Sequence, residues 1–414
     1  TNYRYLFFLS LIVFRFLLEF SYVGIVSQKY SYAGFELNFG VINYITSWIF
    51  FFISFLFVKD HVYKVSDYFF TIAFIFVIVP LAVLYGYDLG RSVLPLITAV
   101  FSFMFIKFIV EFRYVSFKKV PTIKNGLNYV IVICLLFVTF LVVWYYLSGV
   151  VYNLNLKKVY DYRENNFKLS SLGVLAYTNI WTFKIFNMVL FAIALYFKRY
   201  FLSFLVFLVQ VYFFAASANK GVLFTPFMIL GVWFYLRRTS GLLALPIAMS
   251  SLILVTLFTF YIFNDIWVSS LFSRRLFFVP AHLTYVYFDF FNSNPYVYWS
   301  NSLLSSFSNY PYDTSLAHMI GRYLGKDMSA NNGFIALGYA HAGLYGVFLY
   351  SLIIGVILRF INDVTYKLIP IWFAVALTIV PLKKLLTSSD LFTTMLTHGF
   401  IVALIILLLV RSNR

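Results

Sequence analysis

Long apolar runs alternate with short polar segments along most of the chain. Twelve runs of near-spanning length lie at about residues 5–26, 39–58, 68–86, 92–112, 127–148, 177–197, 200–217, 221–236, 241–265, 333–358, 366–382 and 391–410. A helical run of about 20 apolar residues matches the hydrocarbon thickness of a bilayer. The pattern predicts an all-α polytopic membrane protein with about twelve transmembrane helices in a single membrane domain, residues 1–414. The seventh and eighth runs are short and nearly abut, so a re-entrant hairpin is the alternative there.

Two longer polar segments interrupt this pattern, at residues 149–176 and 267–332. The shorter one contains NLNLKKVYDYRENN, which is polar enough to lie at a membrane surface. It is either a plain connecting loop or a lid that helps to bind an acceptor. The longer one collects arginine, histidine, aspartate, asparagine and tyrosine in a chain that is 63% hydrophobic. We expect residues 267–332 to form the chemical head, a long outer loop that carries short helices.

The charge distribution orients the predicted helices. The formal net charge is +17, yet the cations stand in small groups at the ends of apolar runs, which favours anchoring at the cytoplasmic surface over nucleic-acid binding. Short segments on the N-terminal side of the membrane are rich in lysine and arginine and poor in acids. Both termini are therefore predicted to be cytoplasmic, and both long segments to lie on the opposite side. The first run keeps Arg15 and Glu19 and lacks a small-residue cleavage site, which indicates a retained span.

Ionisable residues inside the runs are expected to face other helices, because a charge in contact with lipid is costly. Arg15 and Glu19 are four residues apart, as are Lys107 and Glu111, so each pair shares a helix face. Both are predicted to be self-neutralising structural pairs. Lys184 has no such neighbour and is expected to reach an interface.

The head opens with a motif that predicts a helix. In SRRLFFVPAHLTYVYFDFF, residues 273–291, Pro280 suits the first turn. From that start His282, Tyr285 and Asp289 fall on one face. We predict a membrane-surface helix whose polar face carries an imidazole, a phenol and a carboxylate. Its opposite face would place three rings in lipid, those of Phe288, Phe290 and Phe291.

Cations next to this helix suggest an anion site. Arg274 and Arg275 precede it, and Lys220 stands in the turn motif SANKG at residues 217–221. Arginine forks match phosphate oxygens, and lysine offers a point charge of the same sign. The alternatives are arginines that contact lipid headgroups and a plain turn with an anchoring lysine.

The rest of the head mixes amides with aromatic rings. Asn292–Trp299, Tyr310–Asp313 and Asn331–Asn332 suit a sugar platform, although turn chemistry explains the asparagines and prolines equally well. In the tenth run, GFIALGYAHAGLYGVFLY, small residues at 338, 342 and 346 favour close helix packing. His341 in this run is either a bonded core residue or a catalyst. The candidate sugar-binding residues are Tyr285, Asn331 and His341.

Several kinds of chemistry lack their motif in this chain. A Walker motif, Gly-x-Ser-x-Gly, His-Glu-x-x-His, a Cys/His cluster and paired carboxylates on a turn are all absent. Their absence argues against ATP use, serine hydrolysis and zinc binding. We expect neither a cofactor nor a metal.

Three stretches resemble the bacterial O-antigen polymerases, the Wzy-type oligosaccharide repeat-unit polymerases: SANKG, RRLFFVPAHLTYVYFDFF and ANNGFIALGYAHAGLYGVFLYSLIIGVIL. The motifs cover about residues 215–360, and the number of apolar runs and the placement of the loops resemble this family over the whole chain. It implies a membrane-embedded glycosyltransferase of the C type, surrounded by the lipids of the bacterial inner membrane. The enzyme would act on the periplasmic face and move a growing glycan from undecaprenyl pyrophosphate onto a new lipid-linked repeat unit, with a chain-length regulator protein as partner.

The resemblance also implies roles for single residues. Arg274 and Arg275 would hold the donor pyrophosphate, with Lys220 and Arg322 assisting. Preorganised positive charge of this kind stabilises a leaving phosphate as its bond breaks.

A base must take the proton of the acceptor hydroxyl. His282 is the first candidate because the ordinary pKa of histidine lies near working pH, and Asp289 and His341 follow. Many relatives carry glycine where this chain has Ala281-His282, so His282 departs from the family pattern.

Two other functions share much of this profile. An O-antigen ligase would use the same lipid-linked donor with a different acceptor. A flippase or transporter of lipid-linked oligosaccharides would more often show two related halves, with its charges inside the bundle.

Overall fold

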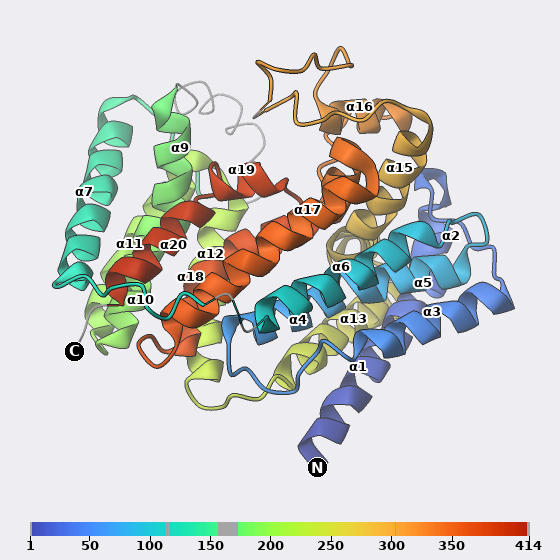
Figure 1. The fold of residues 1–414 in the computed structure, drawn as a ribbon, viewed down its shortest axis with the longest axis horizontal. Helices are drawn as coiled ribbons and strands as arrows, with labels where there is room; N and C mark the ends of the chain where they lie inside the picture. The colour runs from blue at the N-terminus through green and yellow to red at the C-terminus, as the bar shows by residue number, and fades with distance from the viewer. Residues whose placement is uncertain (1, 113, 115, 156–172, 303, 412–414) are drawn as a thin grey trace. The chain divides into compact units, whose positions relative to one another are not determined.

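The computed structural model describes residues 2–112, 114, 116–155, 173–302 and 304–411, and this part of the chain is helical, without a β-strand (Figure 1). Its contacts group into two compact units, each assembled from three separate stretches. The first comprises residues 1–114, 241–359 and 383–391, and the second residues 115–240, 360–382 and 392–414. Each unit is described by itself below. The predicted single domain stays a prediction.

The first unit contains most of the predicted head. Its elements up to residue 114 are α1 (Asn2–Ser21), η1 (Tyr22–Val26), α2 (Ser27–Lys29), η2 (Ser31–Ala33), α3 (Val41–Ser54), α4 (Val65–Ala73), η3 (Phe74–Ile78), α5 (Val79–Tyr87) and α6 (Leu94–Glu111). Its later elements are α13 (Ala244–Phe263), α14 (Ile266–Ser269), η5 (Ser270–Phe278), α15 (Val279–Ser293), α16 (Leu316–Tyr323) and the larger part of α17 (Phe334–Thr365).

The second unit is built from apolar helices. They are α7 (Gly126–Leu147), α9 (Val174–Trp181), η4 (Thr182–Phe186), α10 (Asn187–Tyr196), α11 (Tyr200–Ser217), α12 (Lys220–Leu236), most of α18 (Ile371–Thr387), most of α19 (Leu391–Met395) and α20 (Phe400–Val410). Residues 156–172 of the predicted outer segment 149–176 lie outside the described residues, and the choice between loop and lid falls there.

Eight helical stretches of the described chain are long and apolar enough to cross a membrane, which fits the predicted polytopic membrane protein. Three further apolar helices are shorter: α3, α12 and α20 have 14, 17 and 11 residues. The predicted count of twelve therefore stays a prediction. The run predicted at 391–410 is interrupted, because Gly399 has φ +72° and separates α19 from α20.

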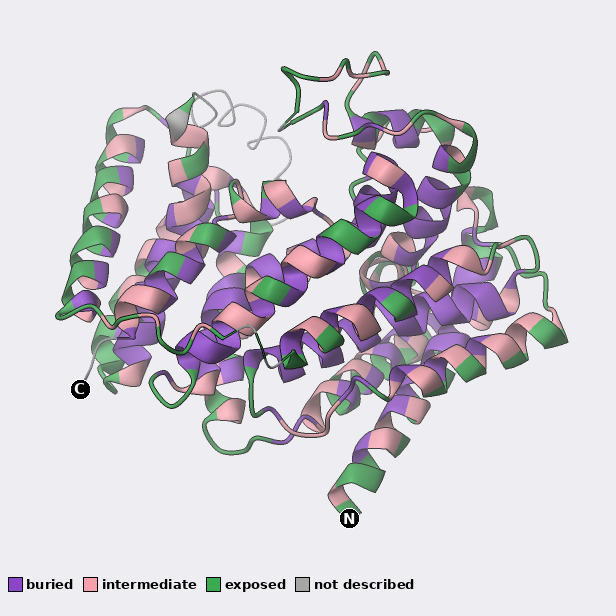
Figure 2. Cartoon of the chain, viewed as in Figure 1, coloured by how far each residue is buried: buried purple, intermediate pink, exposed green. Residues whose placement is uncertain are grey.

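The centre of the first unit is the stretch α4–η3–α5, which is buried along almost its whole length (Figure 2). Its own π-helical segment η3 contacts the π-helical segment η5, which in turn contacts η1. Phe277 of η5 packs between Phe14 and Phe76, with ring centroids 5.5 and 5.4 Å away. π-helical turns are rare and often occur at functional sites. The predicted head thus begins inside the core of this unit.

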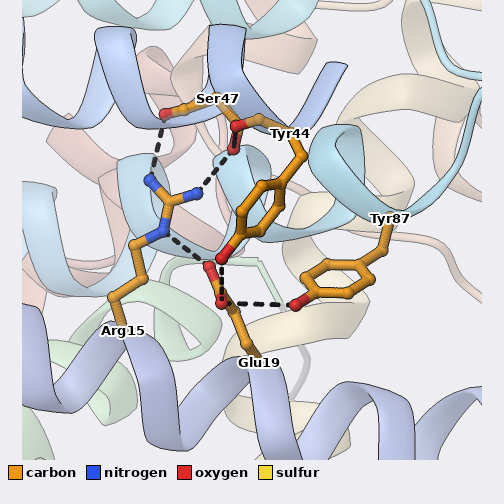
Figure 3. Close-up of polar contacts among 5 residues, drawn as sticks. All are labelled: Arg15, Glu19, Tyr44, Ser47 and Tyr87. Atoms are coloured by element: carbon orange, nitrogen blue, oxygen red, sulfur yellow. Dashed lines mark hydrogen bonds and ion pairs between the residues drawn. The ribbon is translucent and has the colours of Figure 1, made fainter. Parts of the chain in front are cut away.

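A buried ion pair joins α1 to α3 (Figure 3). Arg15 Nε lies 2.8 Å from Glu19 Oε1, and both side chains are almost fully buried. The guanidinium also donates to the carbonyl and the hydroxyl oxygen of Ser47, while the Tyr44 and Tyr87 hydroxyls donate to the other carboxylate oxygen at 3.1 and 3.3 Å. The prediction of a self-neutralising structural pair is confirmed here.

The second predicted pair does not form. No carboxylate oxygen of Glu111 lies within ion-pair distance of Lys107 in the described structure, and Lys107 instead donates to the Leu56 carbonyl. Spacing allowed the pair, but a carbonyl at the end of α3 offers Lys107 another partner.

Helix α17 is broken near its N-terminal end. Ala342 has φ −154° and Gly343 has φ +59° with ψ −142°, a combination that suits glycine almost exclusively. Gly346 is so close to Gly338 that a Cβ on Gly346 would lie 2.0 Å from the Gly338 carbonyl oxygen. The small residues predicted to serve helix packing therefore face each other across a bend of their own helix.

This bend yields a prediction on stability. A Cβ at Gly343 would lie 2.9 Å from the Tyr296 hydroxyl, whereas a Cβ at Gly325, with φ +69°, would meet nothing within 4 Å. We expect Gly343→Ala to lower the unfolding free energy by about 3 kcal/mol and the matched Gly325→Ala by about 1 kcal/mol. Melting temperatures in detergent would measure both, and equal shifts would show that the bend does not depend on Gly343.

Candidate functional site

The head begins with one helical stretch, because α14, η5 and α15 follow one another without a break. Pro280 stands in the first turn of α15, as predicted. The predicted lipid face is wrong: Phe288 and Phe291 are 3% and 2% exposed. Phe288 stacks on Tyr339 of α17, with centroids 3.8 Å apart. The helix packs inside the protein because it has apolar residues on more than one side.

Arg91, in the segment between α5 and α6, organises the site. Its Nε lies 2.9 Å from Asp88 Oδ2, and its Nη2 donates to the Gly34 carbonyl oxygen at 2.8 Å. Its Nη1 lies 3.2 Å from His282 Nδ1. The guanidinium carbon is also 5.0 Å from the centre of the Tyr285 ring. Arg91 thus joins three segments that are far apart in the sequence, and no motif predicted it.

The contact with Arg91 decides the protonation state of His282. A guanidinium only donates hydrogen bonds, so His282 Nδ1 accepts and the ring proton resides on Nε2. Burial and the nearby charges of Arg91 and Lys326 lower the pKa of His282 to about 3. The ring is therefore a neutral donor at neutral pH, and its Nε2 atom is buried without a hydrogen-bond partner.

The lowered pKa predicts how stability depends on pH. Above pH 6.5 His282 is neutral in the folded and in the unfolded chain, so it adds no pH dependence there. Between pH 6.5 and about 3 only the unfolded chain takes up the proton, which favours unfolding by about 2 kcal/mol at pH 5. We expect acidification from pH 7 to 5 to lower the melting temperature of the wild type more than that of His282→Gln. Equal losses would contradict the buried neutral imidazole.

Arg274 and Lys326 contact rings of the segment that contains Gly34, and Arg275 follows Arg274 in η5; none of the three has a carboxylate partner among the described residues. The guanidinium carbon of Arg274 is 4.3 Å from the centre of the Tyr30 ring, and Lys326 Nζ is 5.7 Å from that of Tyr32. Arg275 is exposed. Within the described residues, no carboxylate oxygen lies within 4.0 Å of any of the three. Charge that the protein does not neutralise is available to an anion.

Asp289 is the acid nearest to these cations along α15. Burial raises its pKa, and the positive charge of Arg91 partly opposes this effect. Its carboxylate makes no hydrogen bond or ion pair with the described residues, and it stays partly exposed. These properties suit a carboxylate that accepts a proton.

The remaining predicted site residues do not form one group. Arg322 forms an exposed ion pair with Asp313, at 3.1 Å. The Tyr285 hydroxyl donates to the buried Leu81 carbonyl, and Asn331 donates to Ser329 at the surface. No hydrogen bond or ring contact of the described chain joins Tyr285, Asn331 and His341, the predicted sugar-binding residues, to one another.

Lys220 lies in the second unit, at the start of α12. Ala218 adopts the left-handed conformation with φ +48°, and the Asn219 side chain accepts a hydrogen bond from the Gly221 amide. The turn chemistry of SANKG is thus confirmed, and a role of Lys220 in phosphate binding stays a prediction.

His341 belongs to a second polar cluster in the first unit. Its Nδ1 accepts a hydrogen bond from the Trp299 amide, and its Nε2 lies 3.5 Å from Asp390 Oδ1. Tyr350 donates to the same carboxylate oxygen at 2.6 Å and accepts from the Trp299 indole at 2.8 Å. Tyr298 and Trp299 have positive φ values, which is rare for such bulky residues.

This cluster fixes the bend of α17 to the head. The amides of Val297 and Tyr298 donate to the carbonyls of Ala340 and His341, which the bend leaves without helical partners. Sequence spacing identified His341 alone: Tyr350 lies in the same apolar run without a polar neighbour that marks it, and Asp390 lies between two later runs.

The described residues contain no group of three histidine, cysteine, aspartate or glutamate side chains placed to hold a metal ion. The chain matches no family model, no curated protein and no solved structure. Inferences on function therefore rest on the chemistry of the two clusters and on the sequence motifs.

Proposed function

We propose that this protein is a membrane glycosyltransferase of the C type that polymerises undecaprenyl-pyrophosphate-linked repeat units into O-antigen or a related surface polysaccharide. The observation that carries the proposal is that Arg91, Arg274 and Lys326 contact one short segment, residues 30–34, and that two of them, Arg274 and Lys326, have no carboxylate partner within ion-pair distance among the described residues. A pyrophosphate diester supplies the negative charge that such a group would neutralise.

In the proposed reaction an acceptor hydroxyl attacks the anomeric carbon of the lipid-linked glycan. The new glycosidic bond forms while the bond from this carbon to the pyrophosphate oxygen breaks, and the electron pair leaves with the pyrophosphate. Arg274 and Arg275 stabilise the developing charge on the leaving group. The donor is already activated, so the step needs neither ATP nor a nucleotide sugar.

We assign the acceptor proton to Asp289 rather than to His282. The Nδ1 atom of His282 already accepts from Arg91, and its low pKa makes the ring a weak base. Asp289 has a pKa raised by burial and no hydrogen-bond partner among the described residues, so its carboxylate is a better proton acceptor than an ordinary aspartate. His341 is disfavoured for the same reason as His282, because its Nδ1 accepts from the Trp299 amide and its Nε2 faces Asp390.

Deletion of the gene tests the proposal. We expect surface glycan reduced to a single repeat unit, while the lipid-linked units still reach the outer side. A ligase would instead leave lipid-linked polymer without attached glycan, and a flippase would trap the units inside. A normal long-chain ladder in the deletion strain would refute the polymerase.

A further inference from the structure

One short segment of the first unit contacts three cations that come from three separate parts of the chain. The segment is Tyr30–Glu36. Arg274 lies over the ring of Tyr30, Lys326 over the ring of Tyr32, and Arg91 donates to the carbonyl oxygen of Gly34. Ring faces and a backbone carbonyl are neutral, so the charges of Arg274 and Lys326 are not neutralised by this segment, whereas Arg91 has its ion pair with Asp88.

The same segment also covers the unused donor of His282. The ring of Phe35 lies 5.0 Å from the imidazole, and a Cβ on Gly34 would lie 2.9 Å from Nε2. His282 is 8% exposed, and its Nε2–H has no partner within the described chain. A buried donor without an acceptor is uncommon and calls for an explanation. Gly34, with φ +85°, lets the backbone pass directly over this donor.

Both ends of the segment are anchored. At one end the Tyr30 amide donates to the Val26 carbonyl, and at the other the Tyr22 hydroxyl donates to the Glu36 carbonyl. Phe35 is 2% exposed, whereas Tyr32 is 75% exposed. The part of the segment that a substrate would displace is therefore the short turn between Tyr30 and the buried Phe35.

We propose that Arg91, Arg274, Lys326 and the Nε2–H of His282 form the binding site for the pyrophosphate of a polyprenyl-linked substrate, and that Tyr30–Glu36 covers this site until the substrate replaces it. The phosphate oxygens take the positions of the Gly34 carbonyl and the tyrosine rings. The inference rests on the proposed function, and it names the donors of that site.

The substrate can displace the segment because the cations bind phosphate oxygens more strongly than they bind tyrosine rings and a backbone carbonyl. Cation–ring contacts at exposed positions are weak, and a bond to a neutral carbonyl is weaker than a charge-assisted bond to phosphate. A pyrophosphate also supplies an acceptor for the unpaired imidazole donor. The covering segment is thus a competitor that the substrate can displace.

Binding of farnesyl pyrophosphate to the purified full-length protein in detergent tests this site. Inorganic pyrophosphate and phosphatidylglycerol serve as parallel probes, because a lipid headgroup offers similar phosphate chemistry. We expect farnesyl pyrophosphate to bind at least tenfold more tightly than phosphatidylglycerol, and inorganic pyrophosphate to compete with it. Equal affinity for phosphatidylglycerol, or no binding of either pyrophosphate, would overturn the inference.

Two substitutions of His282 separate its two nitrogen atoms. The side chain introduced by His282→Gln would place an amide N–H near the position of Nε2, and the shorter one introduced by His282→Asn would place its amide near that of Nδ1. We expect His282→Gln to bind farnesyl pyrophosphate within threefold of the wild type and His282→Asn at least tenfold more weakly. If His282 had only a structural role, the loss of binding would parallel the loss of melting temperature in each variant. Equal binding of farnesyl pyrophosphate by the two variants would show that Nε2 does not contact the pyrophosphate.

The covering role predicts a gain of affinity. Tyr32→Ala removes the ring that competes for Lys326, so we expect binding to become about threefold tighter, while Tyr5→Ala, at another exposed tyrosine of the same unit, leaves it unchanged. Hydrogen exchange of residues 30–36 should rise when farnesyl pyrophosphate binds. Unchanged exchange, or weaker binding by Tyr32→Ala, would refute the cover.

These outcomes are independent of the glycan ladder that tests the proposed function. A strain with the expected single-unit phenotype, whose purified protein binds the probe equally in all variants, would keep the polymerase and refute this site.

Discussion

Arg275→Ala is expected to abolish polymerisation while the protein still inserts into the membrane at normal levels. The side chain is exposed and makes no ion pair among the described residues, so its removal does not disturb the fold. If it holds the leaving pyrophosphate, the loss of one preorganised charge lowers the rate by about 10²–10³-fold. The glycan ladder of a complemented deletion strain, together with a membrane immunoblot, measures both effects.

Two comparisons sharpen this result. Arg4→Ala removes another exposed arginine of the first unit, for which the charge pattern predicts the cytoplasmic side, and it should keep the full ladder. Arg275→Lys keeps the charge but loses the planar fork, and we expect an intermediate ladder. Unchanged polymerisation by Arg275→Ala would remove this residue from the site.

Glu19→Gln is expected to cause the largest loss of stability among single changes in the first unit. It leaves the Arg15 guanidinium charged and buried without a carboxylate, beside the Ser47 oxygens and the rings of Trp48 and Phe51. Breaking a buried ion pair by removing one member costs about 3–5 kcal/mol. The melting temperature in detergent and the yield of monodisperse protein would report this loss.

The double variant Arg15→Met with Glu19→Gln separates charge from packing. It has no buried charge, and the amide oxygen of the introduced glutamine can still accept from Tyr44 and Tyr87, so most of the lost stability should return. Glu111→Gln is the control for the same change of side chain, since Glu111 is an exposed residue at the end of α6 and has no ion pair in the described structure. If Glu19→Gln melts like Glu111→Gln, the pair contributes little.

The apolar runs predicted the helices well because burial in a bilayer requires long uninterrupted hydrophobic stretches. The run at 127–148 corresponds to α7, Gly126–Leu147, and that at 92–112 to α6, Leu94–Glu111. Hydropathy does not reveal where a run bends, so the interruption at Gly399 and the bend at Gly343 were missed. A glycine in an apolar run is compatible with close helix packing and with a break of the helix. Only the residues in contact with the glycine determine which of the two occurs.

The site was predicted in part. Arg274, His282 and Asp289 stand within one polar stretch, so composition located them. Arg91 and Gly34 did not stand out, because they contact each other across 57 residues and Arg91 reaches His282 across 191. Contacts over such separations follow from helix packing, which a single sequence does not specify. The three-residue spacing of Asp88 and Arg91 was the one feature of the local sequence that could have indicated this part of the site.

The π-helical segment η1 lies between the two ends of the first span. Before it α1 directs Arg15 and Glu19 toward α3, and after it the chain leads to Tyr30. A π-helical turn takes up one residue more than an α-helical turn in nearly the same rotation. Deleting one residue between Tyr22 and Val26 would therefore restore regular α-helical winding and leave both the ion pair and the side that Tyr30 presents nearly unchanged, so η1 is a place where the first span tolerates a change of length.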